Sequence, residues 1–263
     1  MSTPPSRLVS ELSGPALASA LSAESILVLP TGATEHHGPH LPLATDLIMA
    51  ESLATAVVDA AVAAGADVWR LPGLAYTKSD EHHWAPGTIW LSGDTLMRSI
   101  VDIGSSVAAT PARTLVFYNA HGGNIALLQV ALRELRRRFG LRTFLISLAM
   151  PAGDGVEGPD ELGFGIHGGH AETSMILHLR PELVDLTLTE RRVPDQLADH
   201  ELIRFNGGAV SFGWLSDDFG PSGVIGDPTG ANAEWGSTLF DRAVDAGVAA
   251  LHEIARFDPR PAP

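Results

Sequence analysis

The side chains best suited to chemistry lie in one short stretch, residues 32–46, which contains a glutamate, three histidines and an aspartate. Carboxylate oxygens and imidazole nitrogens together make a ligand set suited to divalent transition metals. Glu35 and His37 are two residues apart, so they point the same way where the chain is extended. Asp46 can fold back to meet them. The stretch therefore indicates a metal site.

Two later stretches carry the same residue types. Residues 119–124 contain His121, and residues 165–174 contain His167 and Glu172. Both are rich in glycine, which lets the backbone approach a ligand closely. Any one of these side chains alone is better explained as part of a polar surface loop. Three such stretches in one chain favour a shared site.

The elements that must position these side chains alternate between strand and helix. Apolar runs predict strands at 25–30, 67–71, 114–118 and 143–149, and helices are predicted at 47–64, 94–109, 125–138 and 231–256. Thr45 or Asp46 is expected to cap the first of these long helices. Strand–helix–strand units have parallel strands and right-handed crossovers. We therefore predict an α/β fold with three layers, helix, sheet and helix, around a mainly parallel sheet.

Composition limits the classes of protein to which the chain can belong. Its 263 residues, 45% hydrophobic and 18% charged, are enough for one large domain over 1–263. The absence of cysteine excludes disulfides, thiolate metal sites and cysteine nucleophiles. Residues 1–15 lack the basic start and apolar run of a signal peptide, and no apolar segment reaches the roughly 20 residues of a membrane span. We expect a soluble, cytoplasmic protein.

Charge argues against nucleic acid and membranes as partners. The net charge is −14, from 31 acidic and 17 basic residues, whereas both partners select a positive surface. The basic cluster at 136–138 falls at the end of a predicted helix, where it complements the helix dipole. Glycines in 163–168 match a dinucleotide-binding pattern, but a proline and two acids stand where its strand is required, so we reject that pattern.

The three stretches resemble the signature motifs of the creatininase family of metal-dependent amidohydrolases. The blocks Gly-x-x-Glu-x-His-Gly-x-His-Leu-Pro-x-x-x-Asp, Asn-x-His-Gly-Gly-Asn and His-x-Gly-x-x-Glu-Thr-Ser occur in this order within 32–174. Weaker likeness extends over 79–91 and 213–231. The resemblance implies a creatininase-like fold, two divalent metal ions at a binuclear site, and a homo-oligomer, specifically a hexamer. Zinc is the first expectation for the metal, with manganese or iron as alternatives.

The resemblance also assigns roles to the matching positions. One metal would be held by Glu35, Asp46 and His121, and the other by His37, Asp46 and Glu172, with Asp46 shared. His167 matches a histidine thought to act in proton transfer. A water activated by the metals would attack the carbonyl of a small-molecule amide or cyclic amide. His167 would then pass a proton to the leaving nitrogen.

One departure from the family concerns the substrate. Creatininase proper carries a tyrosine and a glutamate directly after the histidine equivalent to His121, whereas this chain has Gly122 and Gly123. The change argues against creatinine and makes Glu172 the expected source of the missing carboxylate, with a part in catalysis. The Gly-Gly form resembles relatives that act on other amides, including the mycofactocin precursor peptide peptidase.

Alternatives to a small-amide hydrolase stay open at this stage. They are a peptidase of the mycofactocin type, a metal-assisted hydrolase of a cyclic sugar ketone, and a non-catalytic metal or metabolite binder. The retained His167 argues against the binder, because a pure binding site needs no acid–base residue.

Several further side chains are candidates for contact with the substrate or support of the site. The candidates for substrate contact are His83, Trp84, His170 and Trp214. His36 faces away from Glu35 and His37 in an extended chain, and His40 is expected to brace its loop. Residues 181–230 predict a long ordered loop, which acts either as a lid over the site or as an oligomer contact.

Overall fold

A sheet of four parallel strands lies at the centre of the computed structural model, which describes residues 6–148, 150–156 and 158–259. The strands are β1 Ile26–Thr31, β2 Val68–Arg70, β3 Thr114–Asn119 and β4 Arg142–Ser147, in the order β2-β1-β3-β4. They match the predicted strands to within two residues, although Ala149, the predicted end of the last, lies outside the described residues. The parallel pairing follows from the helical crossovers between the strands.

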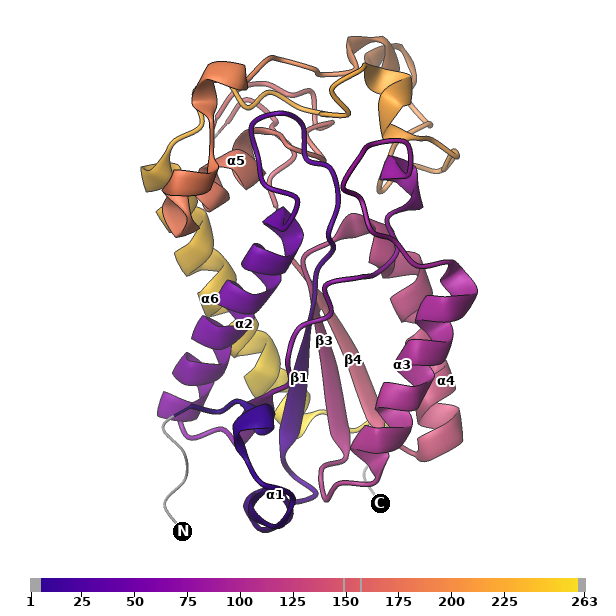
Figure 1. Cartoon of the computed structure of the whole chain (residues 1–263), viewed down its shortest axis with the longest axis vertical. Coiled ribbons are helices and arrows are strands. Elements are labelled where there is room, and N and C mark those ends of the chain that lie inside the picture. The colour runs from indigo at the N-terminus through magenta and orange to yellow at the C-terminus, as the bar shows by residue number, and fades with distance from the viewer. Residues whose placement is uncertain (1–5, 149, 157, 260–263) are drawn as a thin grey trace.

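Helices cover both faces of this sheet. They are α1 Gly14–Ala20, α2 Thr45–Ala63, α3 Gly93–Ala108, α4 Ile125–Phe139, α5 His170–Leu179 and α6 Ala233–Arg256. Figure 1 shows α2 and α6 on one face and α3 and α4 on the other. The prediction of a three-layer α/β/α fold with a parallel sheet is confirmed.

Strand β1 illustrates why the sheet is buried on both sides. Leu27 and Leu29 belong to the apolar cluster formed with α3 and α4, whereas Ile26 and Val28 belong to the cluster formed with α2 and α6. Successive side chains of a strand point to opposite faces, so a strand covered by two helical layers needs apolar residues throughout. The continuous apolar run at 26–29 therefore encodes a central strand.

The start of α2 corrects one prediction. The helix begins directly after Ala44, and neither Thr45 nor Asp46 caps it through a side-chain hydrogen bond. The Thr45 hydroxyl donates to the Pro42 carbonyl at 2.8 Å, and the Asp46 carboxylate faces two histidines instead of the helix N–H groups. Gly32 makes this possible, because a Cβ at that position would lie only 2.5 Å from the Leu47 Cα atom.

The segment between α5 and α6 lies beyond the carboxyl ends of the strands (Figure 1). It is largely irregular, as predicted, with short 3-10 turns at Pro181–Leu183, Leu186–Leu188, Asp195–Asp199 and Ser216–Phe219. A separate apolar cluster holds part of it in place, formed by Phe164, Val193 and Leu197 with Phe205, Phe212 and Phe219. Among the described residues, no helix is long and apolar enough to cross a membrane.

Truncation of Leu53 tests whether the α2 layer contributes to stability as this packing implies. Leu53 is fully buried against the sheet, so Leu53→Ala should lower the free energy of unfolding by about 2–5 kcal/mol through lost contacts and a cavity. Leu202 is 61% exposed, and Leu202→Ala should change the free energy of unfolding by less than about 0.5 kcal/mol. Urea denaturation of both variants measures the difference, and equal effects would contradict the described core.

Candidate metal centre

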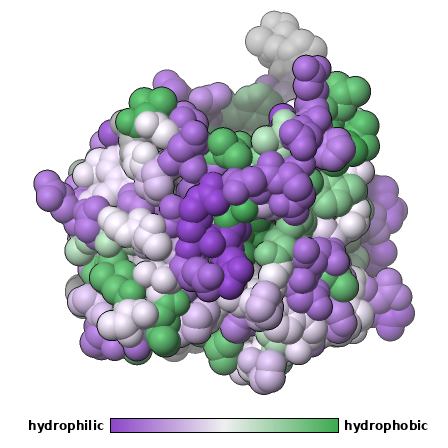
Figure 2. Space-filling view, turned by 90° about the horizontal axis from the view of Figure 1, so that it is seen from above, coloured by the Kyte–Doolittle hydropathy of each residue, from purple (hydrophilic) through white to green (hydrophobic). Residues whose placement is uncertain are grey.

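Acidic and imidazole side chains converge beyond the carboxyl ends of β1 and β3, the edge at which open α/β sheets bind ligands. The convergent side chains predicted from the sequence are Glu35, His37, Asp46, His121, His167 and Glu172. They come from the loop after β1, the start of α2, the loop after β3 and the residues at the start of α5. Figure 2 views this end of the molecule and shows strongly hydrophilic residues gathered near its middle.

Asp46 lies between two imidazoles. Its Oδ1 atom is 3.3 Å from His37 Nε2, and its Oδ2 atom is 3.0 Å from His121 Nδ1. His121 Nε2 in turn lies 3.3 Å from Glu35 Oε2. Each oxygen of Asp46 therefore faces a different histidine, which is the arrangement needed for a carboxylate shared between two ions.

Backbone carbonyls orient both of these histidines. His37 Nδ1 lies 3.2 Å from the carbonyl of Glu35, and His121 Nε2 lies 2.5 Å from the carbonyl of Lys78. A ring nitrogen that donates to a carbonyl keeps its proton, so with an ion bound the opposite nitrogen can present its lone pair to that ion. In both rings that opposite nitrogen is the one that faces Asp46.

Several polar atoms of the centre are buried without a hydrogen-bond partner. They are both carboxylate oxygens of Glu35, His37 Nε2 and Asp46 Oδ2. Burial of unpaired polar atoms is costly, and a cation among them would satisfy the oxygens and nitrogens together. Within the described part of the chain, ligand atoms of His37, Asp46 and Glu172 lie within 4.8 Å of one another. The donor set therefore fits divalent metal ions.

The electrostatics of the cluster lead to the same conclusion. Burial raises the pKa of Glu35 to about 8, which His121 opposes and Asp46 reinforces. Burial also raises the pKa of Glu172 to about 7. Burial opposes ionisation of Asp46 too, but the neighbouring His37 and His121 outweigh it and hold the pKa of Asp46 below its usual value. The carboxylates crowd one another, and added positive charge would relieve their repulsion.

His167 is placed to exchange a proton with a group bound at the centre. Its Nε2 atom lies 2.7 Å from the His36 carbonyl, and its Nδ1 atom lies 3.7 Å from Glu35 Oε1. Burial, together with the charges of His82 and His37, lowers the pKa of His167 well below its usual value. The ring is therefore neutral near pH 7, with the Nδ1 lone pair facing the carboxylates. The same atom also lies close enough to Glu35 and His37 to share a metal with them.

Sequence reasoning missed Glu81 and His82. Glu81 Oε1 lies 3.6 Å from His121 Nε2, and His82 Nε2 lies 3.5 Å from Glu35 Oε1. The buried His82 ring stacks on His167 with centroids 4.0 Å apart. A 3-10 turn over Asp80–His82 turns these two side chains toward the centre. The adjacent Glu-His pair within the weakly family-like stretch 79–91 was the available signal.

A cavity of about 500 Å³ opens from the metal centre. Its lining includes Lys78, Glu81 and Gly123, and also Phe205, Asn206 and Trp214. Part of the segment between α5 and α6 therefore forms a wall of this cavity. Of the four predicted substrate contacts, Trp214 lines it.

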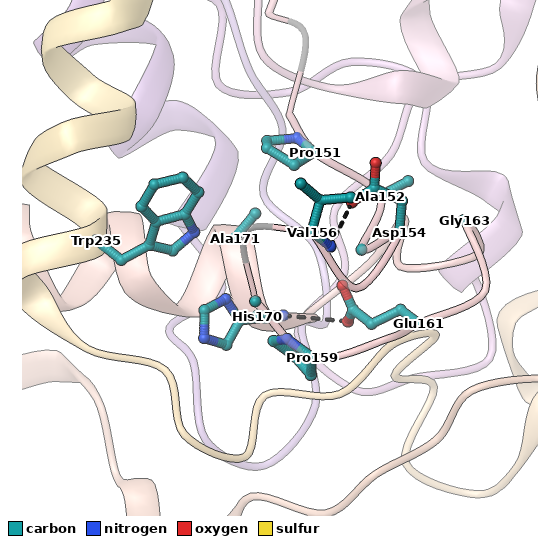
Figure 3. A pocket seen from close by; sticks show the side chains of 12 residues that line it. Pro151, Ala152, Asp154, Val156, Pro159, Glu161, Gly163, His170, Ala171 and Trp235 are labelled. Carbon is teal, nitrogen blue, oxygen red and sulfur yellow. Dashed lines mark hydrogen bonds between the residues drawn. The ribbon is translucent and has the colours of Figure 1, made fainter.

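The other three predicted contacts lie elsewhere. His83 is exposed, with its Nδ1 atom 2.9 Å from the Asp80 carbonyl, and Trp84 donates through Nε1 to the Ser216 hydroxyl at 2.8 Å. His170 lines a neighbouring cavity together with Trp235 and Glu161, and its backbone N–H donates to Glu161 (Figure 3). Tertiary packing, which residue type alone does not reveal, decides these positions.

His36 and His40 support the loops of the site. His36 Nε2 lies 2.8 Å from the Ser222 carbonyl, which joins the loop after β1 to the segment before α6. His40 Nε2 lies 3.0 Å from the Thr173 hydroxyl, which joins the same loop to α5. Burial lowers the pKa of both rings, so both act as neutral hydrogen-bonding groups.

These features define an α/β protein with a carboxylate–histidine metal centre at the carboxyl edge of a parallel sheet. The profile of one family, described as creatinine amidohydrolase, matches residues 10–251. The chain therefore belongs to the creatininase family, and it is a hydrolase that acts on carbon–nitrogen bonds. This confirms the family membership inferred from the sequence motifs.

Two relatives illustrate the range of the family. The chain is 36% identical over 244 residues to the mycofactocin precursor peptide peptidase of Mycobacterium ulcerans (strain Agy99). The aligned region covers 89% of this chain and 86% of that protein. It is 34% identical over 198 residues to the creatinine amidohydrolase of Pseudomonas putida, and that aligned region covers 68% of this chain and 70% of the relative.

Solved creatininase structures share the fold. One, described as creatininase Mn, is 27% identical with a TM-score of 0.73 and covers 96% of this chain and 100% of its own. A mutant creatininase of the Zn-Zn type is 25% identical with a TM-score of 0.70, covering 96% of this chain and 99% of its own. Creatininases therefore carry manganese or zinc on this fold.

Two neighbouring glycines provide a test of the centre. A Cβ at Gly123 would collide with the Glu81 carboxylate and lie 2.6 Å from His121 Nε2, whereas a Cβ at Gly122 would meet no atom within 4 Å. Gly123→Ala should therefore weaken metal binding by about tenfold or more, because it displaces groups around a ligand. Gly122→Ala should bind metal like the wild type. Titration with zinc against a chromophoric chelator measures both affinities, and equal values would contradict the described packing.

Proposed function

We propose that the chain is a binuclear metallohydrolase that cleaves an amide bond near the end of a peptide, as a precursor peptide peptidase of the mycofactocin type. The observation that carries this proposal is the likeness to such a peptidase over most of both chains. Gly122 and Gly123 add support, because this form departs from creatininase proper. A hydrolase of a small amide is the second candidate, favoured by the likeness to creatinine amidohydrolase.

The shape of the space around the centre supports an extended substrate. The cavity at the centre shares His121 and Glu172 with a second cavity. That cavity shares Ala152 and Ala171 with the third, in which Trp235 and His170 lie (Figure 3). The three cavities thus lie next to one another, and together they offer more space than a single small ring fills.

The proposed metal ligands are the five side chains that match the family motifs, and their closeness to Asp46 supports this assignment. Glu35 and His121 would hold one ion, and His37 and Glu172 the other, with Asp46 shared between them. When bound, the two ions would supply positive charge that polarises an amide carbonyl and lowers the pKa of water toward neutral pH. Zinc or manganese suits these oxygen and nitrogen donors.

The chain's own residues would then control protons and water. His167 is neutral, so its Nδ1 atom can take a proton from the attacking water and return it to the leaving nitrogen. The His36 carbonyl fixes the ring orientation by accepting the Nε2 proton. Phe205, Phe212 and Trp214 add apolar surface to the cavity.

A comparison of substrates tests the proposed reaction. With metal present, the protein should shorten the mycofactocin precursor peptide, which mass spectrometry detects, while creatinine and formamide remain intact. Treatment with EDTA should abolish cleavage, and zinc or manganese should restore it, because the buried carboxylates need the ions. Turnover of creatinine with an intact peptide would replace this proposal with the small-amide candidate.

Replacement of His167 tests its role as a proton carrier. His167→Ala should reduce peptide cleavage by about 10²–10⁴-fold, the usual contribution of general acid–base catalysis. Elemental analysis should still find two metal ions per chain, as in the wild type. A loss of metal together with activity would instead identify His167 as a ligand.

A further inference from the structure

We infer that Glu81 is a further metal-binding residue of the centre, delivered from a separate loop into space that Gly123 leaves free. This inference rests on the proposed binuclear site and extends it, since neither the sequence motifs nor the ligand set assigned above includes Glu81. Its role would be to hold the ion beside Glu35 and His121.

The loop that carries Glu81 is attached to the ligand loop after β3. The Lys78 N–H donates to Asn124 Oδ1 at 3.1 Å, and the Lys78 carbonyl accepts from His121 Nε2 at 2.5 Å. These two bonds hold the chain three residues before Glu81 against His121. The 3-10 turn that follows then brings Glu81 Oε1 to 3.6 Å from His121 Nε2, so the carboxylate stands beside the ring whose Nδ1 atom is available to a metal ion.

Gly123 provides the space for this carboxylate. A Cβ at position 123 would collide with Glu81 Oε1 and lie 2.8 Å from the Lys78 carbonyl oxygen. Any side chain there would compete with the Glu81 carboxylate for the same volume. The side chain of Glu81 is only 14% exposed, so it points inward and not into solvent.

Among the groups of ligand atoms that lie close enough to hold an ion, one contains Glu81. Ligand atoms of Glu35, Glu81 and His121 lie within 4.8 Å of one another, as do those of His37, Asp46 and Glu172, while Glu35 and His37 also form a group with His167. With the shared Asp46, Glu81 would give the ion beside His121 a fourth protein ligand. With Asp46 Oδ2 only 3.0 Å from His121 Nδ1, the first two groups adjoin through Asp46.

Charge balance points the same way. The two groups together contain four carboxylates, those of Glu35, Asp46, Glu81 and Glu172, with a formal charge of −4 when all are ionised. Two divalent cations carry a charge of +4 and neutralise them. Glu81 is the carboxylate of this set that lies beside His121 and Gly123.

The test compares Glu81→Gln with Glu51→Gln. Glu51 is a partly buried carboxylate of α2 whose Oε1 atom accepts from the Gly73 N–H at 3.3 Å, and it does not line the cavity at the centre. Each protein is loaded with zinc, dialysed against a weak chelator and analysed for metal per chain. Cobalt-loaded samples are compared by their visible absorption, which reports the ligands around the ion independently of activity.

We expect about two zinc ions per chain in the wild type and in Glu51→Gln, and about one in Glu81→Gln, with at least a tenfold loss of affinity at the weaker site. The cobalt spectrum of Glu81→Gln should change as well. Two ions with unchanged affinity and spectrum in Glu81→Gln would overturn the role of Glu81 and leave the proposed binuclear hydrolase standing. A single ion in the wild type would overturn both proposals.

Discussion

The structure depends on one arrangement, the buried Asp46 carboxylate between the imidazoles of His37 and His121. A buried carboxylate is costly unless positive charge or hydrogen bonds compensate it. The surroundings supply two imidazoles, and beyond them stand the unpartnered oxygens of Glu35. The fold thus concentrates negative charge at the end of its sheet, in a place where only a cation satisfies every group at once.

The fold positions this arrangement through close backbone packing. The loop after β1 approaches the first turn of α2 so closely that only glycine fits at position 32. The parallel register aligns Thr31 of β1 with Asn119 of β3, so the loops that follow both strands emerge side by side. Helix α5 packs against α6 and α2, and this packing places its first turn, which carries Glu172, at the metal centre. The sheet and its two helical layers therefore act as a rigid frame for the ligands.

Much of this could be predicted from the sequence, because the signals are local. The apolar run of β1, the glycine-rich motifs and the strand–helix alternation fix the parallel sheet and bring Glu35, His37 and His121 to one edge. The positions of His83 and Trp84 could not be predicted, since a short 3-10 turn at Asp80–His82 directs the two preceding side chains, and not these two, toward the centre. Glu81 and His82 were missed for the same reason. The hexameric assembly, the cytoplasmic location and the exclusion of nucleic acid and membranes stay predictions.

The origin of the cavity walls has a consequence for how such a protein diverges. Phe205, Phe212 and Trp214 belong to a segment with its own small apolar cluster, separate from the clusters that bury the sheet. Substitutions, insertions or deletions in this segment can therefore reshape the space offered to a substrate at little cost to the sheet or the metal ligands. Substrate preference and fold stability thus depend on largely different residues. One metal centre can therefore be retained while related proteins evolve to act on different substrates.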